Sequence, residues 1–319
     1  TNNSFEMELF QALPLSEQEL VIYTKRFKGS YNHWTGAIQH ISCGSRVDIG
    51  YAIMRLAGYN ACPKAPCFKA LHQFMQYLFH HPHIPIMYPR KATSTSAVIK
   101  SHCAKGKAEI ENLDNIKNYT GLKGYVDADL ARDLATRRST SSSIHEYNGV
   151  AFAWNCTKQS AIMDCTNGSE IKALFKGTKK TKIFRRFLES AGRPLTHPTP
   201  TYEDNDATIA QILKDRLTPR IKHLDIPMTI LHEDHRRGVY VAAYCPTDLN
   251  ISDVNTKPHG GVTLQKKIMW TTGFRYYPPA GSEHYKLLEL DKYKIGCHRG
   301  SFRKDLVYKA KTTTPTKEK

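Results

Sequence analysis

The spacing of apolar residues changes along the chain and separates a helical first part from a mixed second part. Before about residue 90, apolar residues recur every three or four positions. This predicts one helix over 34–56, with a break near Gly44, and another over 67–79. Residues 1–30 show little periodicity. The expected core positions of the two helices are Ile38, Ile41, Ile49, Ile53, Leu56, Leu71, Phe74, Met75 and Leu78.

From residue 122 onward, short strands alternate with helices. Asn148-Gly149 lies between two apolar runs, which is a strong signal for a β-hairpin. We expect strands at 124–127, 144–147, 150–154, 201–202 and 239–244, and helices at 169–190, 206–217, 226–235 and from 252. Because antiparallel strands come first and crossover helices follow, the order predicts an α/β fold, a mixed five-stranded sheet with flanking helices.

A polar stretch rich in Ser, Thr and Lys separates the two parts. We therefore expect a mostly helical segment at 1–92, a linker at 93–118, an α/β domain at 119–265 and an extension at 266–319. The extension ends in KAKTTTPTKEK, a composition typical of disorder. The chain begins with Thr1 in place of Met, which indicates a piece cut from a longer polypeptide.

The charge balance points to a class of partner. The 319 residues include 46 Lys and Arg against 29 Asp and Glu, a net charge of +17. Such an excess indicates a polyanionic partner, and nucleic acid is favoured over an anionic membrane. No window approaches the ~18 apolar residues of a membrane span, and the N-terminus lacks the apolar core of a signal peptide. We therefore expect no membrane partner and no secretion.

Cysteine and histidine clusters offer weaker signals. The eight cysteines are irregularly spaced, so we expect reduced and mostly buried thiols. Cys62 and Cys67 are not followed by a second pair at zinc-finger spacing, which disfavours structural zinc. The FHHPH run at 79–83 is explained by a helix C-terminus closed by proline.

Four carboxylates in the second half carry the candidate chemistry. Asp127, Glu170, Asp204 and Asp253 are separated by 43, 34 and 49 residues, and each lies near a strand end or a helix start. Such positions can meet at one side of a sheet, where the acids would repel one another unless divalent cations lay between them. Hard cations prefer oxygen ligands, so the site would hold two Mg²⁺ ions ~3.5–4 Å apart, with Mn²⁺ as an alternative. An acidic metal site on a basic chain predicts an enzyme that cuts nucleic acid.

Six sequence blocks lie in the order and spacing of a known family. They are GYVDADLARDLATRRSTS (124–141), AFAWNCTKQ (151–159), SEIKALFKG (169–177), TYEDNDATIA (201–210), IKHLDI (221–226) and YCPTDLNISDVNTKP (244–258). Through these blocks the chain resembles the reverse transcriptase and ribonuclease H region of Ty1/copia-type retrotransposon polyproteins. Residues 31–56 and 68–78 more loosely resemble the segment that joins polymerase to ribonuclease H in those polyproteins.

The resemblance implies a ribonuclease H-like fold for 119–265 and a thumb- or connection-like remnant of reverse transcriptase for 1–92. It assigns the four catalytic and metal-binding acids to Asp127, Glu170, Asp204 and Asp253. It implies Mg²⁺-dependent cleavage of the RNA strand of RNA–DNA hybrids. The implied partners are the hybrid and the polymerase portion of the same polyprotein. The implied location is the cytoplasm, in a virus-like particle, and/or the nucleus.

Three departures from the family pattern keep a second function open. Leu130, Ser142 and Gly168 stand where the family has an aromatic residue, a glycine and an acidic residue. The alternative is a catalytically inactive or domesticated nucleic-acid-binding fragment. DNA synthesis is not expected, because Ala128 separates the two acids of YVDAD and the adjacent pair of a polymerase motif is absent from the sequence.

Basic residues crowd the first long helix of the α/β domain. Lys176, Lys179, Lys180, Arg185 and Arg186 are the candidate contacts to the phosphates of a hybrid, with a solvated helix face as the alternative. We expect lesser roles for Arg137, Arg138 and Trp154, a turn or capping role for Asp129, Asp206 and Asp248, and a structural or substrate-facing role for His223 and Asp225.

Overall fold

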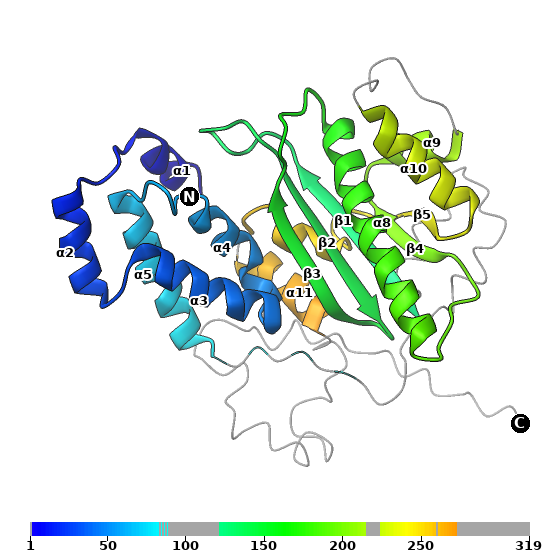
Figure 1. Cartoon of the computed structure of the whole chain (residues 1–319), viewed down its shortest axis with the longest axis horizontal. Coiled ribbons are helices and arrows are strands. Elements are labelled where there is room, and N and C mark those ends of the chain that lie inside the picture. The colour runs from blue at the N-terminus through cyan, green and yellow to red at the C-terminus, as the bar shows by residue number, and fades with distance from the viewer. Residues whose placement is uncertain are drawn as a thin grey trace, which may run out of the picture.

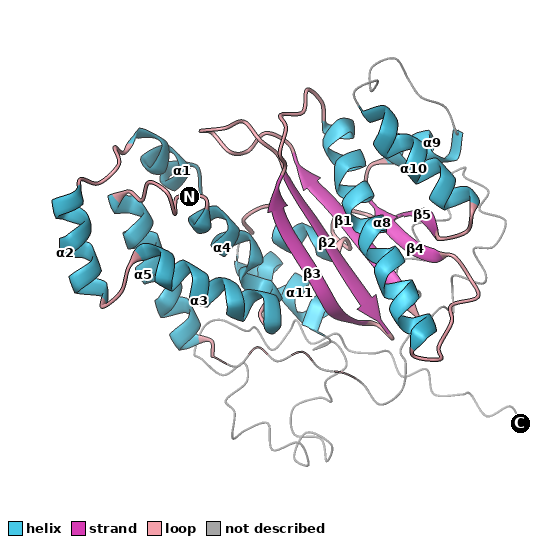
Figure 2. Ribbon diagram, in the orientation of Figure 1, coloured by secondary structure: helices cyan, strands magenta, loops and turns pink. Residues whose placement is uncertain are grey.

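The computed structural model describes residues 2–82, 84, 86, 88, 121–214, 224–259 and 261–272. A group of helices lies beside an α/β unit, and Figures 1 and 2 show the two from the same side. The predicted linker, the tail beyond residue 272 and His223 lie outside the described residues. No helix within the described ranges is long and apolar enough to cross a membrane.

Five α-helices and one short 3₁₀ helix build the N-terminal group. They are α1 (Asn2–Gln11), α2 (Glu17–Phe27), α3 (Tyr31–Gly44), η1 (Val47–Ile49), α4 (Gly50–Ala57) and α5 (Ala65–His80). The predicted helix over 34–56 is thus broken near Gly44, as expected. The apolar faces of these helices meet around Ile53, Phe68 and Leu71, all of which are fully buried.

The helices α1 and α2 are a correction, because little periodicity was expected over 1–30. A local signal for α2 was present in the sequence. The side chain of Ser16 caps the helix by accepting from the backbone N–H of Glu19, and the Glu19 carboxylate accepts from the backbone N–H of Ser16. Ile41, an expected core position, is also a correction, since its side chain is 41% exposed.

The α/β unit is built on a five-stranded mixed sheet with the strand order β3-β2-β1-β4-β5. The strands are β1 (Leu122–Asp129), β2 (Thr140–Tyr147), β3 (Val150–Lys158), β4 (Thr199–Glu203) and β5 (Tyr240–Tyr244). The first three are antiparallel neighbours, and β4 and β5 run parallel to β1. Asn148 and Gly149 have positive φ, as a tight hairpin turn between β2 and β3 requires. The predicted sheet and hairpin are confirmed.

Helices cover both faces of the sheet, and the strands alternate between the two cores. The helices α8 (Thr166–Ser190), α9 (Asp206–Lys214) and α10 (Asp225–Arg236) bury Val126 and Ala242 on one face. The opposite face buries Tyr125 and Ala243 against η3 (Ile251–Asn255) and α11 (Gly261–Thr272). Adjacent residues of a strand therefore serve different cores, as the period of two requires.

The N-terminal helices join the second of these cores. Val47 of η1 belongs to the same buried cluster as Tyr125 and Ile251. The α11 helix, which contacts η1 and η3, continues past residue 265, where the α/β domain was expected to end. The positions of the domain boundaries stay predictions.

The thiols that the structure describes are free. They are not mostly buried, although mostly buried thiols had been expected. The six cysteines that the structure describes form no disulfide. Two of them, Cys67 and Cys245, are buried, whereas Cys43 and Cys62 are exposed. The expectation of mostly buried thiols is therefore wrong for Cys43 and Cys62, and the reduced state of the thiols stays a prediction.

Candidate active site

Three of the four predicted acids meet at one edge of the sheet. One carboxylate oxygen each from Asp127, Glu170 and Asp204 lies within 4.8 Å of the others. Asp127 and Glu170 are buried, at 2% and 3% exposure, and Asp204 is partly exposed. The cluster lies in an open pocket of about 480 Å³, which Asn205, Thr247 and Lys257 help to line.

The strand register explains why these acids meet. Tyr125 of β1 pairs with Tyr202 of the parallel strand β4, so Asp127 and Asp204, each two residues further on, lie at the same level of the sheet. The α8 helix packs along β1 and begins at that end of the sheet, which brings Glu170 in its first turns over Asp127. The carboxylate of Glu170 also accepts a hydrogen bond from the backbone of Ala128.

The acids destabilise one another's ionised form. Burial raises the pKa of Asp127 to about 7, with further contributions from the Asp253 and Asp204 carboxylates. Burial, followed by the nearby carboxylates of Glu203, Asp127 and Asp204, raises the pKa of Glu170 well above its usual range. Both effects favour the protonated acids unless a positive charge enters the pocket.

This donor set fits a divalent cation. Oxygen ligands are what Mg²⁺ prefers, and three carboxylate oxygens converge here from three different elements. The Oε2 atom of Glu170 is buried and has no hydrogen-bond partner among the described residues. A cation would supply the missing partner and relieve the repulsion.

Glu203, which we did not predict as a site residue, is a further acid beside the cluster, and it is buried. Its side chain is fully buried, and its Oε1 atom accepts from the backbone N–H groups of Asp204 and Asn205, each at 3.2 Å. Burial and the carboxylates of Asp204 and Asp127 raise its pKa well above the usual range. The available signal was an acid at the end of a buried strand, directly before a predicted ligand.

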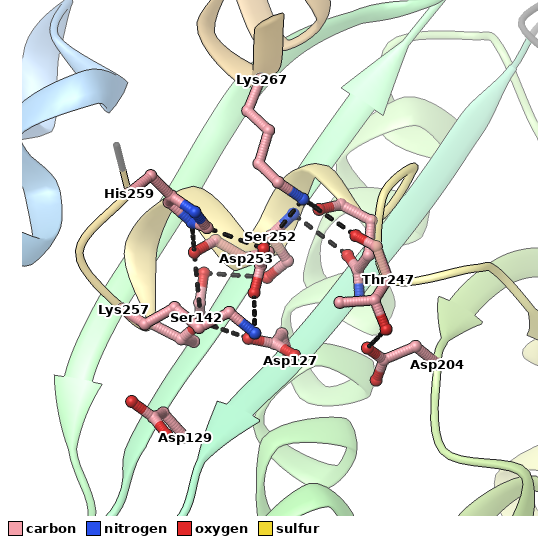
Figure 3. A network of polar contacts seen from close by, with 12 residues as sticks. Asp127, Asp129, Ser142, Asp204, Thr247, Ser252, Asp253, Lys257, His259 and Lys267 are labelled. Atoms are coloured by element: carbon pink, nitrogen blue, oxygen red, sulfur yellow. Dashed lines mark hydrogen bonds and ion pairs between the residues drawn. The ribbon is translucent and has the colours of Figure 1, made fainter. Parts of the chain in front are cut away.

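Asp253, the fourth predicted acid, lies beside the cluster but is not one of its three members. Its Oδ1 atom forms an ion pair with Lys257, and its Oδ2 atom lies 2.9 Å from the Nζ atom of Lys267. His259 Nε2 lies 3.4 Å from the same Oδ2 atom. Asp253 lies on η3, and Figure 3 shows its carboxylate surrounded by the side chains of Lys257, Lys267 and His259. Its predicted role as a metal ligand is not tested.

The loop after β5 is fastened to the site from several sides. Thr247 donates a 2.7 Å hydrogen bond to Asp204 Oδ2, and Thr256 donates to Asp127 Oδ2. Asn250 Nδ2 donates to the carbonyl oxygen of Val126 at 2.8 Å. From α11, the buried Lys267 ammonium donates to the carbonyl oxygens of Thr247 and Asn250 at 2.9 and 3.0 Å. The orientation of the acids thus depends on residues far along the chain.

The predicted basic contacts do not form one uniform ridge. Arg185 donates to the carbonyl oxygens of Leu195 and His197 and to the hydroxyl of Thr199, so it fastens the end of α8 to the segment before β4. Lys176 lies 3.3 Å from the hydroxyl of Thr157. Lys180 is partly buried, whereas Lys179 and Arg186 are exposed. The nucleic-acid role of all five stays a prediction.

The remaining predicted residues have local partners or positions. Trp154 donates to the carbonyl oxygen of Ser42, and Asp129 forms an ion pair with Arg132. Asp206 lines the pocket from the first turn of α9 without joining the three-acid cluster. Asp225 lies in the first turn of α10.

The strand order, with three antiparallel strands followed by two parallel ones and helices on both faces, defines a ribonuclease H-like fold. Among solved structures, LC11-RNase H1 in complex with an RNA/DNA hybrid matches 42% of this chain and 93% of its own, at 12% identity and a TM-score of 0.34. RNase H1 from Halobacterium salinarum matches 42% and 93%, at 12% identity and a TM-score of 0.31. No family model matches the chain.

The sequence relatives are retrotransposon Pol polyproteins. The chain is 23% identical over 235 residues to the retrovirus-related Pol polyprotein from transposon RE2 of Arabidopsis thaliana, which covers 74% of the chain and 14% of the polyprotein. It is 29% identical over 199 residues to the Pol polyprotein from transposon TNT 1-94 of Nicotiana tabacum, covering 62% and 13%. The resemblance to a retrotransposon polyprotein is confirmed, and the chain spans about a seventh of the relatives' length.

A relative of another kind matches a shorter part of the chain. Secreted RxLR effector protein 161 of Plasmopara viticola is 26% identical over 145 residues, which cover 46% of this chain and 84% of the effector. Sequences of this type therefore also occur outside full-length polyproteins.

Proposed function

We propose that the chain is the ribonuclease H part of a retrotransposon polyprotein and that it cleaves the RNA strand of RNA–DNA hybrids. The observation that carries the proposal is the meeting of Asp127, Glu170 and Asp204 in one open pocket. The relationship to Pol polyproteins supports it, and the net charge of +17 suits a polyanionic substrate. In the cell, the polymerase portion of the same polyprotein would be its partner, in a cytoplasmic particle or in the nucleus.

The chain's residues would bind and orient the reacting groups. Asp127, Glu170 and Asp204 would hold Mg²⁺, with a second ion near Asp253 during the reaction. Mg²⁺, when bound, would supply an activated water and stabilise the leaving 3′ oxygen. Cleavage would produce 5′-phosphate and 3′-hydroxyl ends. Asp127 would release its proton when a cation binds, because burial raises its pKa to about 7 and a divalent positive charge beside it would lower that pKa again.

Substrate recognition would not depend on sequence. Lysine and arginine side chains would contact phosphates, which positions a duplex without reading its bases. Discrimination in favour of RNA would come from contacts to 2′ hydroxyls across the wide minor groove. Binding is therefore expected to weaken steeply as salt rises.

A silent nucleic-acid-binding domain is the second candidate. The effector relative favours this candidate, because the matching region covers 84% of that protein, and its name describes a secreted effector and no polyprotein. A domain of this kind would keep the basic surface and bind hybrid without cutting it. The two candidates differ in one observable, the cleavage of a bound hybrid.

Cleavage of a labelled RNA–DNA hybrid with and without Mg²⁺ tests the proposal. Asp204→Asn should reduce the rate by more than about 100-fold, since even the groups that only orient a metal ligand contribute 10–100-fold. Asp206→Asn is the matched control, because Asp206 lines the pocket outside the three-acid cluster. If the wild type and Asp204→Asn cut equally poorly yet bind hybrid equally well, the second candidate is correct.

A further inference from the structure

The ammonium group of Lys257 lies inside the acidic pocket. Lys257 lines the pocket together with Asp127, Glu170 and Asp204, and its Nζ atom forms an ion pair with Asp253 Oδ1. Figure 3 shows this nitrogen between the carboxylates of Asp253 and Asp127. Burial by itself would lower the pKa of Lys257, but the carboxylates of Asp127, Asp253 and Asp204 raise it. The group therefore keeps its positive charge next to the acids.

Each carboxylate oxygen of Asp253 faces a lysine ammonium group while this arrangement lasts. Lys257 takes its Oδ1 atom, and Lys267 lies 2.9 Å from its Oδ2 atom. The side chains of Asp253 and Lys267 are almost completely buried, at 3% and 5% exposure, whereas that of Lys257 is 31% exposed. Of the two lysines, Lys257 is therefore the one that can leave.

The charges of the three-acid cluster balance with a single metal ion and Lys257. Asp127, Glu170 and Asp204 carry three negative charges once ionised, which one divalent cation and one ammonium group neutralise. The charge of Asp253 is compensated separately by Lys267. A second divalent cation beside Lys257 would be repelled by the Lys257 ammonium and by the first metal ion, and the carboxylate of Asp253 would already be paired with the two lysines.

We propose that Lys257 occupies the second cation position of the nucleic-acid-free protein, so that the pocket takes one divalent ion there and admits a second only when Lys257 moves away. This inference rests on the proposed function, because it presupposes the metal site at the three acids. A phosphate group of the substrate is the ligand that would draw Lys257 out, since an ammonium on a flexible four-carbon stem binds phosphate as a point charge. Lys257 would then both limit metal loading and contact the backbone of the bound strand.

The test is a count of bound Mn²⁺ by electron paramagnetic resonance, with the full chain in the absence of nucleic acid. The wild type should bind one ion tightly, and Lys257→Met should bind two. The dissociation constant of the second ion should be at least tenfold lower in Lys257→Met than in the wild type. Lys257→Arg, which keeps the charge, should again bind one. The double variant Lys257→Met with Asp253→Asn should return the count to one, because it removes the carboxylate that the first change set free.

The outcomes separate this inference from the function on which it rests. If the wild type binds two ions of similar affinity, or if Lys257→Met still binds one, Lys257 does not occupy a cation position while the metal site itself stands. If the wild type binds no Mn²⁺, both the metal site and this inference are wrong. Lys257→Gln is a second uncharged variant, to be used if circular dichroism shows that Lys257→Met is unfolded.

Discussion

The indole nitrogen of Trp154 donates a 2.8 Å hydrogen bond to the carbonyl oxygen of Ser42, and this bond joins β3 to the end of α3. The two residues are 112 positions apart, on either side of the stretch in which a linker was expected. Val47, close to Ser42 in the chain, is buried in the core of the sheet. The N-terminal helices and the sheet therefore share both a core and a polar contact, which predicts that they unfold together.

Trp154→Phe should weaken this coupling. The change removes the donor to Ser42 and should cost about 1 kcal/mol, as the loss of one hydrogen bond does. The wild type should unfold in urea in a single transition, and Trp154→Phe should unfold in two. Near-UV and far-UV circular dichroism followed together would show the two transitions.

Trp34→Phe is the matched control for this measurement. Trp34 Nε1 donates to the carbonyl oxygen of Phe27 at 3.0 Å, entirely within the N-terminal helices. Its replacement should cost a similar amount and leave one transition. Two transitions already present in the wild type would instead indicate two independent units.

The stability of the metal-free protein should depend on the ionisation of Asp127. Its folded pKa of about 7 lies above the ordinary 3.8, so the folded state holds this proton more tightly than the unfolded state. The resulting stabilisation is complete below about pH 4 and is lost as the pH rises through 7, at most ~4 kcal/mol for such a shift. Asp127→Asn cannot ionise, so in EDTA its melting temperature should rise relative to the wild type between pH 4 and 8.

Mg²⁺ provides the second half of that experiment. Added at pH 8, it should restore the wild type and leave Asp127→Asn nearly unchanged, because the variant lacks one of the three ligands. An unchanged difference between the two proteins across the whole pH range would contradict the raised pKa.

The close contact of α8 with β1 should not tolerate a methyl group at Gly177. A Cβ atom there would lie 2.5 Å from Cγ1 of Val126, a fully buried side chain. Gly177→Ala should lower the free energy of unfolding by about 1–3 kcal/mol, as overpacking does. Gly36→Ala in the exposed face of α3 is the control, since a Cβ there meets nothing within 4 Å. It should stabilise the protein by about 0.4–1 kcal/mol in the same thermal melts.

The basic residues of α8 should divide into structural and substrate-binding groups. Arg185 uses its guanidinium to hold the segment before β4, so Arg185→Gln should lower stability and leave the salt dependence of hybrid binding unchanged. Lys179 and Arg186 are exposed, so their replacement by Gln should reduce the salt slope by about 1 for each lost phosphate contact. Binding isotherms at several salt concentrations measure both effects, and equal slopes for all variants would place the substrate elsewhere.

Periodicity and turn chemistry were sufficient to predict the strands, the hairpin and the long helix α8, because these elements depend on local pattern. The meeting of Asp127, Glu170 and Asp204 was predictable from their sequence blocks. The environment of Asp253 was not predictable, since Lys267 reaches it from α11, a helix whose packing depends on long-range contacts. Glu203 was missed for a similar reason, because burial of an acid at a strand end depends on the tertiary fold.

The position of Lys267 also sets the order in which the site can be completed during protein synthesis. This residue fastens the loop that holds Thr247 and Asp253, and it lies 140 residues after Asp127 in the chain. A nascent chain that has released all five strands still lacks it, because α11 follows β5. The acidic pocket therefore matures only after α11 has been synthesised, when the sheet that carries it has already had time to form.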